Sequence, residues 1–156
     1  MTQIPPPVLA PTGFRTTTGI AVMTALAALL LRSALAQQGI AQAVMIAAAL
    51  AALALALAMW RGRRDRLSWT DAGLTDAAGR VIARRDGIAR VDRNPMALKP
   101  SNGFTLHMTE PQARAWQPGL YWRIGQRVGV GGLTSPGVAK ALADRIALET
   151  VEPAAD

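Results

Sequence analysis

The chain contains no cysteine and only one histidine. Disulfide bonds and thiolate metal sites are therefore excluded, and the single imidazole of His107 makes neither a metal site nor a catalytic triad without partners. The glycines between Gly125 and Gly132 do not have the spacing of a phosphate-binding loop. No nucleophile–base pair stands out either. These absences favour a protein that is not an enzyme and that binds neither a cofactor nor a metal.

Charge is also almost absent from one long segment. Between Thr16 and Trp60 the only charged residue is Arg32. A membrane-spanning helix needs about 20 apolar residues, because the hydrocarbon core is about 30 Å thick and each helical residue rises about 1.5 Å. Residues 16–36 and 40–60 each provide such a length, the second more cleanly than the first. With the polar turn Gln37-Gln38-Gly39 between them, they predict a transmembrane helical hairpin.

The first apolar segment permits a second interpretation. Arg15, the apolar run and Ala34-Leu35-Ala36 before Gln37 resemble a secretory signal with a cleavage site. Such a leader would be unusually long and rich in proline, and Arg32 would interrupt its end. The hairpin is the preferred interpretation, and a single-span protein with a cleaved signal remains the alternative.

A basic cluster follows the second apolar segment. Trp60 is followed by Arg61, Arg63, Arg64 and Arg66. Positive residues flank the cytoplasmic ends of membrane spans, and tryptophan suits the headgroup boundary. The pattern predicts a protein of the bacterial inner membrane with its C-terminal part in the cytoplasm. We expect these five residues to contact the lipid headgroups, and residues 61–66 to form a basic linker.

The two helices are predicted to pack through small residues, because lipid provides no hydrophobic drive for helix association. The candidate stripes are Ala21, Ala25 and Ala28 on the first helix and Ala47, Ala51, Ala54 and Ala58 on the second.

The part of the chain after residue 60 is basic. It contains 15 of the 17 basic residues and all 10 acidic ones, which gives a net charge of +5. Because the arginines are scattered singly, nucleic acid is not an expected partner. A basic domain next to a membrane most simply faces anionic lipid.

Beyond the linker the pattern changes to short alternating strands. Residues 67–150 read as a small antiparallel β domain that ends in a helix, so the predicted fold class is α+β. The expected elements are a bent first strand over 67–76, strands over 80–84, 88–93 and 103–109, a loop over 111–119, one long bent strand over 120–130 and a helix capped by Ser135. The expected core residues are Leu74, Val81, Ile82, Ile88, Val91, Phe104, Leu106, Met108, Leu120, Ile124, Leu142 and Ile146. Residues 1–15 are predicted to be a disordered, proline-rich N-terminus, and residues 151–156 a tail.

This order of elements carries a resemblance. Trp69 in the first strand, the segment GRVIARRDGIARVDR, the segment GFTLHMT and a glycine-rich strand before the C-terminal helix resemble a bacterial pleckstrin-homology-like domain. Two spans ahead of such a domain are similar to bacterial membrane proteins of that architecture. Inositide binding is not implied, because the first turn, residues 76–80, carries a single arginine.

Two groups of residues are candidate sites. Arg114, Trp116 and Arg123 combine an aromatic ring with arginines, which suits a partner protein or a membrane interface. Thr134 and Ser135 lead into a helix N-terminus, which can hold an anion. Trp122 is expected in the core. The function that these features predict is a membrane-anchored interaction or scaffolding module, such as an accessory subunit of an inner-membrane complex. The alternative is a domain that senses anionic lipid or a small anion.

Overall fold

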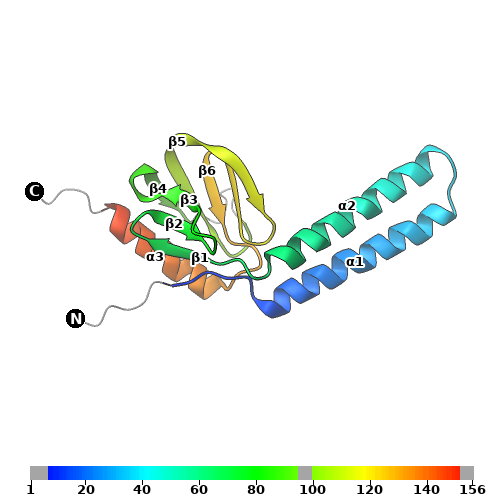
Figure 1. Ribbon diagram of the computed structural model, residues 1–156, viewed down its shortest axis with the longest axis horizontal. Helices are drawn as coiled ribbons and strands as arrows, with labels where there is room; N and C mark the ends of the chain where they lie inside the picture. Colours follow the sequence, from blue (N-terminus) through cyan, green and yellow to red (C-terminus); the bar gives the residue numbers. More distant parts are fainter. Residues whose placement is uncertain (1–6, 95–99, 152–156) are drawn as a thin grey trace, which may run out of the picture. The chain divides into compact units, whose positions relative to one another are not determined.

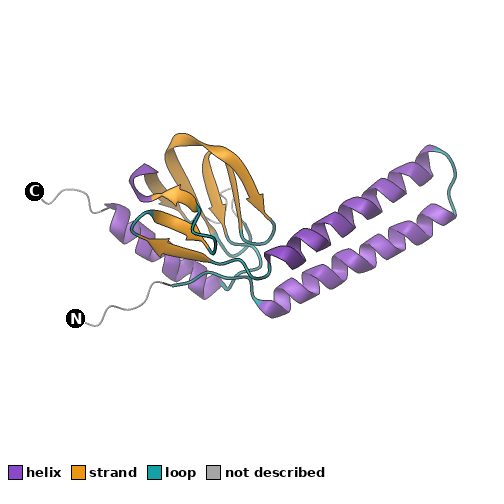
Figure 2. Cartoon of the chain, in the orientation of Figure 1, coloured by secondary structure: helices purple, strands orange, loops and turns teal. Residues whose placement is uncertain are grey.

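The computed structural model describes residues 7–94 and 100–151, and these form two compact units. One unit is the helical segment Gly13–Arg63, and the other combines residues 7–12 with the chain from Arg64 onward. The elements of both units are labelled in Figure 1 and coloured by type in Figure 2. Residues 152–156 of the predicted tail and the loop at 95–99 lie outside the described residues, whereas Val151, also expected in the tail, is the last residue of the C-terminal helix.

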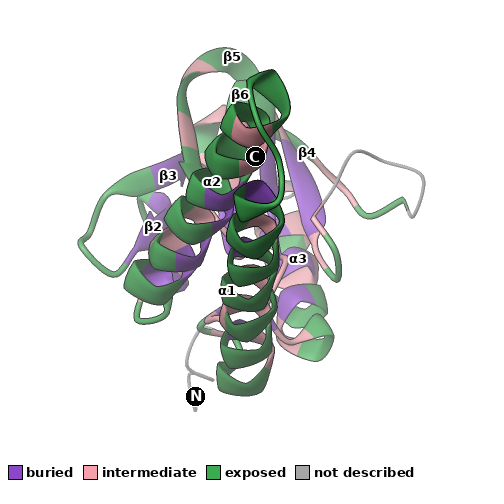
Figure 3. Cartoon of the chain, turned by 90° about the vertical axis from the view of Figure 1, so that its right-hand side faces the viewer, coloured by how far each residue is buried: buried purple, intermediate pink, exposed green. Residues whose placement is uncertain are grey.

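The helical unit consists of α1 (Gly13–Leu35) and α2 (Ile40–Gly62), each of 23 residues. Both are long and apolar enough to cross a membrane, as predicted, and α1 begins three residues earlier than expected. Little of either apolar segment is buried, whereas the core helix of a soluble protein would be mostly buried. Figure 3 shows the outward surfaces of both helices coloured as exposed, and they include Leu29, which is 62% exposed, and Leu50, which is 59% exposed.

The predicted alanine stripes are not the ones that become buried. The buried small residues are Ala27 and Ala34 of α1 and Ala49, Ala52 and Ala56 of α2. The prediction was wrong because the alanine-rich helices offer similar stripes on several faces, so the alanine positions alone do not select one. Gly19 and Met59 mark one close approach, since a Cβ on Gly19 would lie 2.5 Å from the Met59 methyl group.

The second unit is built from two antiparallel three-stranded sheets and one helix, which agrees with the α+β class. The first sheet contains β1 (Leu67–Thr70), β2 (Gly73–Asp76) and β3 (Val81–Arg84), and the second contains β4 (Ile88–Asp92), β5 (Phe104–Gln117) and β6 (Tyr121–Val130). The short 3₁₀ helix η1 (Arg85–Gly87) connects the sheets, and α3 (Pro136–Val151) follows the second sheet.

The turn between β2 and β3 forms as its residues predict. Gly79 has a φ of 78°, and Asp76 accepts hydrogen bonds from the backbone N–H of Ala78 at 3.0 Å and of Arg80 at 2.8 Å. Burial alone would raise the pKa of Asp76, but the hydrogen bonds and positive charge of Arg80 outweigh it, so the pKa lies below its ordinary value. The turn is therefore held by a carboxylate.

Two strand predictions were wrong. Residues 67–76 are not one bent strand but a hairpin, in which Asp71 and Ala72 turn between Thr70 and Gly73. Residues 111–117 are not a loop, because β5 continues to Gln117. Pro111 has no N–H to donate, and it lies where the pairing of β5 with β6 shifts register, between His107 and Gln112. The irregularity lets the strand continue past the proline.

The bend expected in the last strand is present. β6 is one strand of 10 residues, and Gly125 at its middle has a φ of 55°, a left-handed conformation that favours glycine. The two strands β5 and β6 form the arched hairpin visible in Figure 1. Trp122 packs against Gly129 of the same strand, where an added Cβ would lie 2.2 Å from the indole. The bend therefore brings two parts of β6 into contact.

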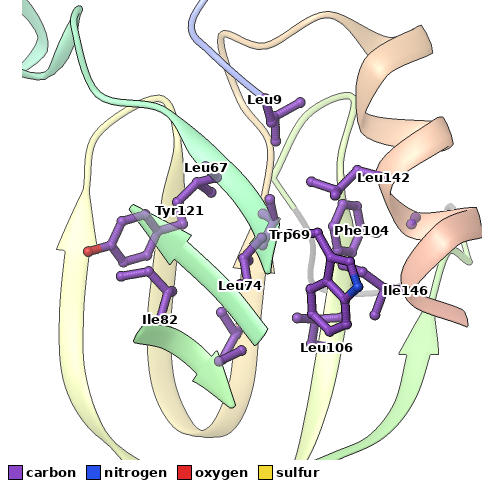
Figure 4. Close-up of a cluster of buried hydrophobic side chains, with 14 of the residues drawn as sticks. Leu9, Leu67, Trp69, Leu74, Ile82, Phe104, Leu106, Tyr121, Leu142 and Ile146 are labelled. Atoms are coloured by element: carbon purple, nitrogen blue, oxygen red, sulfur yellow. The ribbon is translucent and has the colours of Figure 1, made fainter. Parts of the chain in front are cut away.

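A single apolar core lies between the sheets and α3. Trp69, Phe104, Leu106 and Ile146 lie close together in the close-up of Figure 4, and all four are buried. The other fully or nearly buried members include Leu67, Leu74, Ile82, Leu120, Val128, Val130 and Leu142. Most of the predicted core is confirmed, with Val91 partly buried.

Val81 and Ile124 are exceptions, at 38% and 52% exposed. Val81 begins β3 on the side away from Ile82, and Ile124 precedes the bend at Gly125, where the face of the strand changes. Both expectations assumed regular alternation through these irregular positions.

The N-terminal segment also differs from the prediction of disorder, at least in residues 7–12. Leu9 is 0% exposed and exchanges backbone hydrogen bonds with Leu67, at 2.8 and 2.7 Å. Pro11 pairs with Thr134. The segment thus pairs with the first residue of β1 and contributes a leucine to the core.

Helix α3 begins and packs as predicted. Ser135 precedes it, and the Ser135 carbonyl accepts the first helical hydrogen bond from Ala139 at 3.0 Å. Leu142 and Ile146 are fully buried, and Val138 packs partly against the same core. This apolar stripe attaches the helix to the sheets.

Candidate functional site

The C-terminal end of α2 gathers the predicted headgroup residues. Trp60 is half exposed, and the guanidinium carbon of Arg63 lies 4.8 Å from the centre of its ring. Arg61, Arg64 and Arg66 are exposed. Cations near a helix C-terminus also interact favourably with its backbone dipoles. An indole stacked with a guanidinium is thus accompanied by exposed arginines, of which Arg61 belongs to α2 and not to the linker in which it was expected.

A second candidate surface lies on the outer half of the β5–β6 hairpin. Trp116 and Trp122 lie directly opposite each other in the ladder, so both indoles are on one face of the hairpin. Trp116 is 67% exposed, and Trp122, expected in the core, is half-buried against Gly129. We call this surface the tryptophan face. It is completed by Ile124 and by the exposed arginines Arg114 and Arg127.

Arg123 does not belong to this surface. It lies on the opposite face of β6 from Trp122, and its side chain donates to the carbonyl of Ala113 at 2.6 Å and to that of Ile82 at 3.1 Å. These bonds connect β6 to β5 and to β3. Arg123 therefore links the two sheets instead of presenting a charge beside Trp116, as the sequence had predicted.

A hollow of about 870 Å³ lies beside η1 and the end of α3. Its charged lining includes Arg84, Arg85, Asp86 and Glu149. Arg84 forms an ion pair with Asp86 at 3.0 Å, as expected of surface charges. The remaining charges form a more connected group around Glu149.

Glu149 accepts three hydrogen bonds or ion-pair contacts. The indole N–H of Trp69 donates at 2.7 Å, Arg145 Nε at 2.8 Å, and Arg85 lies at 3.2 Å. The hydrogen bond from Trp69, with the charges of Arg145 and Arg85, holds the pKa of Glu149 below its ordinary value against the opposing effect of burial. The sequence did not indicate this group, because Trp69 and Glu149 are 80 residues apart. The charged groups around Glu149 pair with one another within the domain. The hydrogen bond between Glu149 and Trp69 therefore connects α3 to β1.

Of the two residues predicted to form an anion site, the structure leaves only Ser135 accessible to solvent. Thr134 is fully buried and its backbone pairs with that of Pro11, so its side chain does not face solvent. Ser135 stays partly accessible. A hollow of about 250 Å³ near the start of α3 contains Arg93 and Lys140, but Arg93 forms an ion pair with Asp144.

His107 lies on the outward face of β5, between the buried residues Leu106 and Met108, as predicted. Its Nε2 lies 3.6 Å from Asp92 and 3.5 Å from Arg90. A hydrogen bond from the backbone of Asn94, helped by His107 and Arg90, lowers the pKa of Asp92. Within residues 7–94 and 100–151 no three histidine or acidic side chains group so that they could hold a metal ion.

Comparison of the chain with protein-family models, with curated proteins and with solved structures found no match.

Proposed function

We propose that this chain is an inner-membrane protein of two spans whose C-terminal domain lies in the cytoplasm and acts as an anchored interaction module. The observation that carries the proposal is the pair of 23-residue apolar helices, whose bulky side chains are exposed, ending at Trp60 and a cluster of arginines. A bilayer would cover those side chains. The positive cluster after α2 favours a cytoplasmic domain.

The domain is proposed to be pleckstrin-homology-like. Two antiparallel three-stranded sheets closed by a C-terminal helix support this assignment. Such a domain can present a folded surface to a membrane-protein partner, in the manner of an accessory subunit.

The interaction role is preferred to catalysis because the best-connected polar side chains bind other groups of the same domain. Arg123 binds carbonyl groups, Glu149 binds Trp69 and two arginines, and Asp76 caps a turn. Leu9 pairs with Leu67, so the first residue of β1 is not free to pair with a strand of a partner.

Topology is the first test. Reporter fusions that are active only in the cytoplasm should be active at the C-terminus and also at the N-terminus. Mass spectrometry of the mature protein should find the N-terminus intact. A periplasmic C-terminus, or a mature chain that begins at Gln37, would contradict the two-span hairpin.

The interaction role is tested by purifying the full-length chain from native membranes in mild detergent. We expect a membrane protein to co-purify in a fixed ratio. Recovery of the chain alone would contradict the interaction role.

A further inference from the structure

Only short stretches of chain connect the β domain to the two apolar helices. Gly62 ends α2 and Leu67 begins β1, so the intervening residues 63–66 span at most about 18 Å. On the other side, the backbone N–H of Thr12 donates to the carbonyl of Leu133 at 2.8 Å, and α1 begins at the next residue. Helices that cross a bilayer would therefore hold the domain at the bilayer surface, whatever its orientation.

The turn of the β5–β6 hairpin is attached to the same part of the domain. The N–H of Leu133 donates to the carbonyl of Gly119 at 2.9 Å, while its carbonyl accepts from Thr12. Gly119 lies in the turn, three residues after Trp116, and three extended residues span about 10 Å. Backbone hydrogen bonds through one residue thus link the tryptophan face to the residue that precedes α1.

The composition of this hairpin is that of a membrane interface. Trp116 is 67% and Ile124 is 52% exposed, although both are large apolar residues. From residue 111 to residue 127 the sequence contains three arginines and no acidic residue. Indole rings partition to the headgroup region, and guanidinium groups bind phosphate. An acidic membrane surface complements both properties.

We propose that the tryptophan face docks on the same anionic bilayer that the helices cross, and gives the domain a second, peripheral membrane contact. The proposal rests on the membrane anchoring proposed above but not on the existence of a protein partner. The exposed aromatic and aliphatic side chains enter the headgroup region, while Arg114 and Arg127 bind lipid phosphates. Because the chain is already anchored, this contact is intramolecular in effect, so few exposed residues suffice.

The test uses the full-length chain in nanodiscs. Because the chain has no cysteine, Ile124→Cys provides one attachment point for an environment-sensitive fluorophore. The matched control is Leu148→Cys, at an apolar residue of α3 that is 74% exposed. Lipids with brominated acyl chains quench only fluorophores that enter the bilayer.

We expect the label at residue 124 to be quenched several-fold more strongly than the label at residue 148. Phosphatidylglycerol should strengthen the quenching relative to phosphatidylcholine alone, and salt should weaken it. Adding Trp116→Ala and Arg114→Gln to the Ile124→Cys chain should remove most of the effect.

Equal, weak quenching at both positions in phosphatidylglycerol nanodiscs would overturn the proposal. So would a label at residue 124 that is open to solvent in nanodiscs but shielded in native membranes, which would assign the face to a protein. A chain that is extracted from native membranes by alkaline carbonate would overturn the anchoring itself. A chain that stays in the membrane but shows no quenching would instead overturn only the docking of the tryptophan face.

Discussion

At the scale of single residues, Glu149 shows how one half-buried contact depends on charge. A carboxylate at a helix C-terminus interacts unfavourably with the backbone dipoles. Here it is stabilised by a hydrogen bond from the Trp69 indole and by ion pairs with Arg145 and Arg85. Its pKa is lowered in the folded state. The carboxylate therefore contributes stability above its ordinary pKa of about 4.5, and the contribution is lost as the pH falls through the lower folded value.

We predict that Glu149→Ala lowers the free energy of unfolding of the domain by about 1.5–3 kcal/mol at pH 7, because hydrogen bonds to a charged group are lost. The difference from the parent should narrow as the pH falls below the ordinary value of about 4.5 and the parent carboxylate becomes protonated. Urea unfolding of the detergent-solubilised chain, followed by tryptophan fluorescence, measures it. Glu110→Ala, at an exposed position of β5, is the control and should change little. A difference that does not depend on pH would contradict the role of the charge.

At the scale of elements, α3 is held by its apolar stripe. Leu142 is 0% exposed and Leu148 of the same helix is 74% exposed. We predict that Leu142→Ala costs about 2–5 kcal/mol of unfolding free energy by leaving a cavity beneath the helix. Leu148→Ala should stay within about 0.5 kcal/mol of the parent. Similar losses in both variants, measured by urea unfolding, would mean that α3 is not packed as described.

The end of α2 is the second element that makes a prediction. Replacing Arg61, Arg63, Arg64 and Arg66 with Gln should reduce the enrichment of anionic lipid around the protein, since each arginine near the surface contributes about 1 kcal/mol. The effect should weaken at high salt. Lipid analysis of purified nanodiscs measures it, and replacement of the same residues with Lys should preserve the enrichment. Undiminished enrichment in the Gln variant would place the lipid contact elsewhere.

At the scale of the whole molecule, the β domain should fold without the apolar helices, provided that residues 7–12 remain. Leu9 comes from before α1 and completes the core beside Leu67. We predict that a chain in which a short Gly/Ser linker replaces residues 13–63 is soluble and gives dispersed NMR amide signals. The fragment 67–150, which lacks Leu9, should be less stable by about 2–5 kcal/mol.

Leu9→Ala in the linked chain is the control, and it should lose a similar amount of stability. If the linked chain is unfolded in water while the full-length domain is ordered in detergent, the membrane or a partner must complete the core. The margin is small in any case, because a domain of this size buries a limited fraction of its surface.

The features that the sequence determined by itself are those that depend on near neighbours. The two long apolar helices follow from residues 16–60 because their length and apolarity depend only on the local sequence. The β2–β3 turn follows from Asp76 and Gly79, and the buried stripe of α3 from the spacing of Leu142 and Ile146. In each of these the interacting residues lie within a few positions of one another.

Tertiary structure alone decided the features that join distant segments. Leu9 pairs with Leu67, Trp69 binds Glu149, and Arg123 donates to the carbonyl of Ile82. The spacing of apolar residues along a short stretch of sequence cannot show such contacts. The same holds for Trp122, whose place against Gly129 depends on the bend at Gly125. A local pattern specifies which side of a strand is apolar, but which side chains meet across the core depends on how the sheets and helix pack. The sequence indicated Trp116 and Arg114, but the pairing of Trp116 with Trp122 and the loss of Arg123 from this surface were decided by the fold.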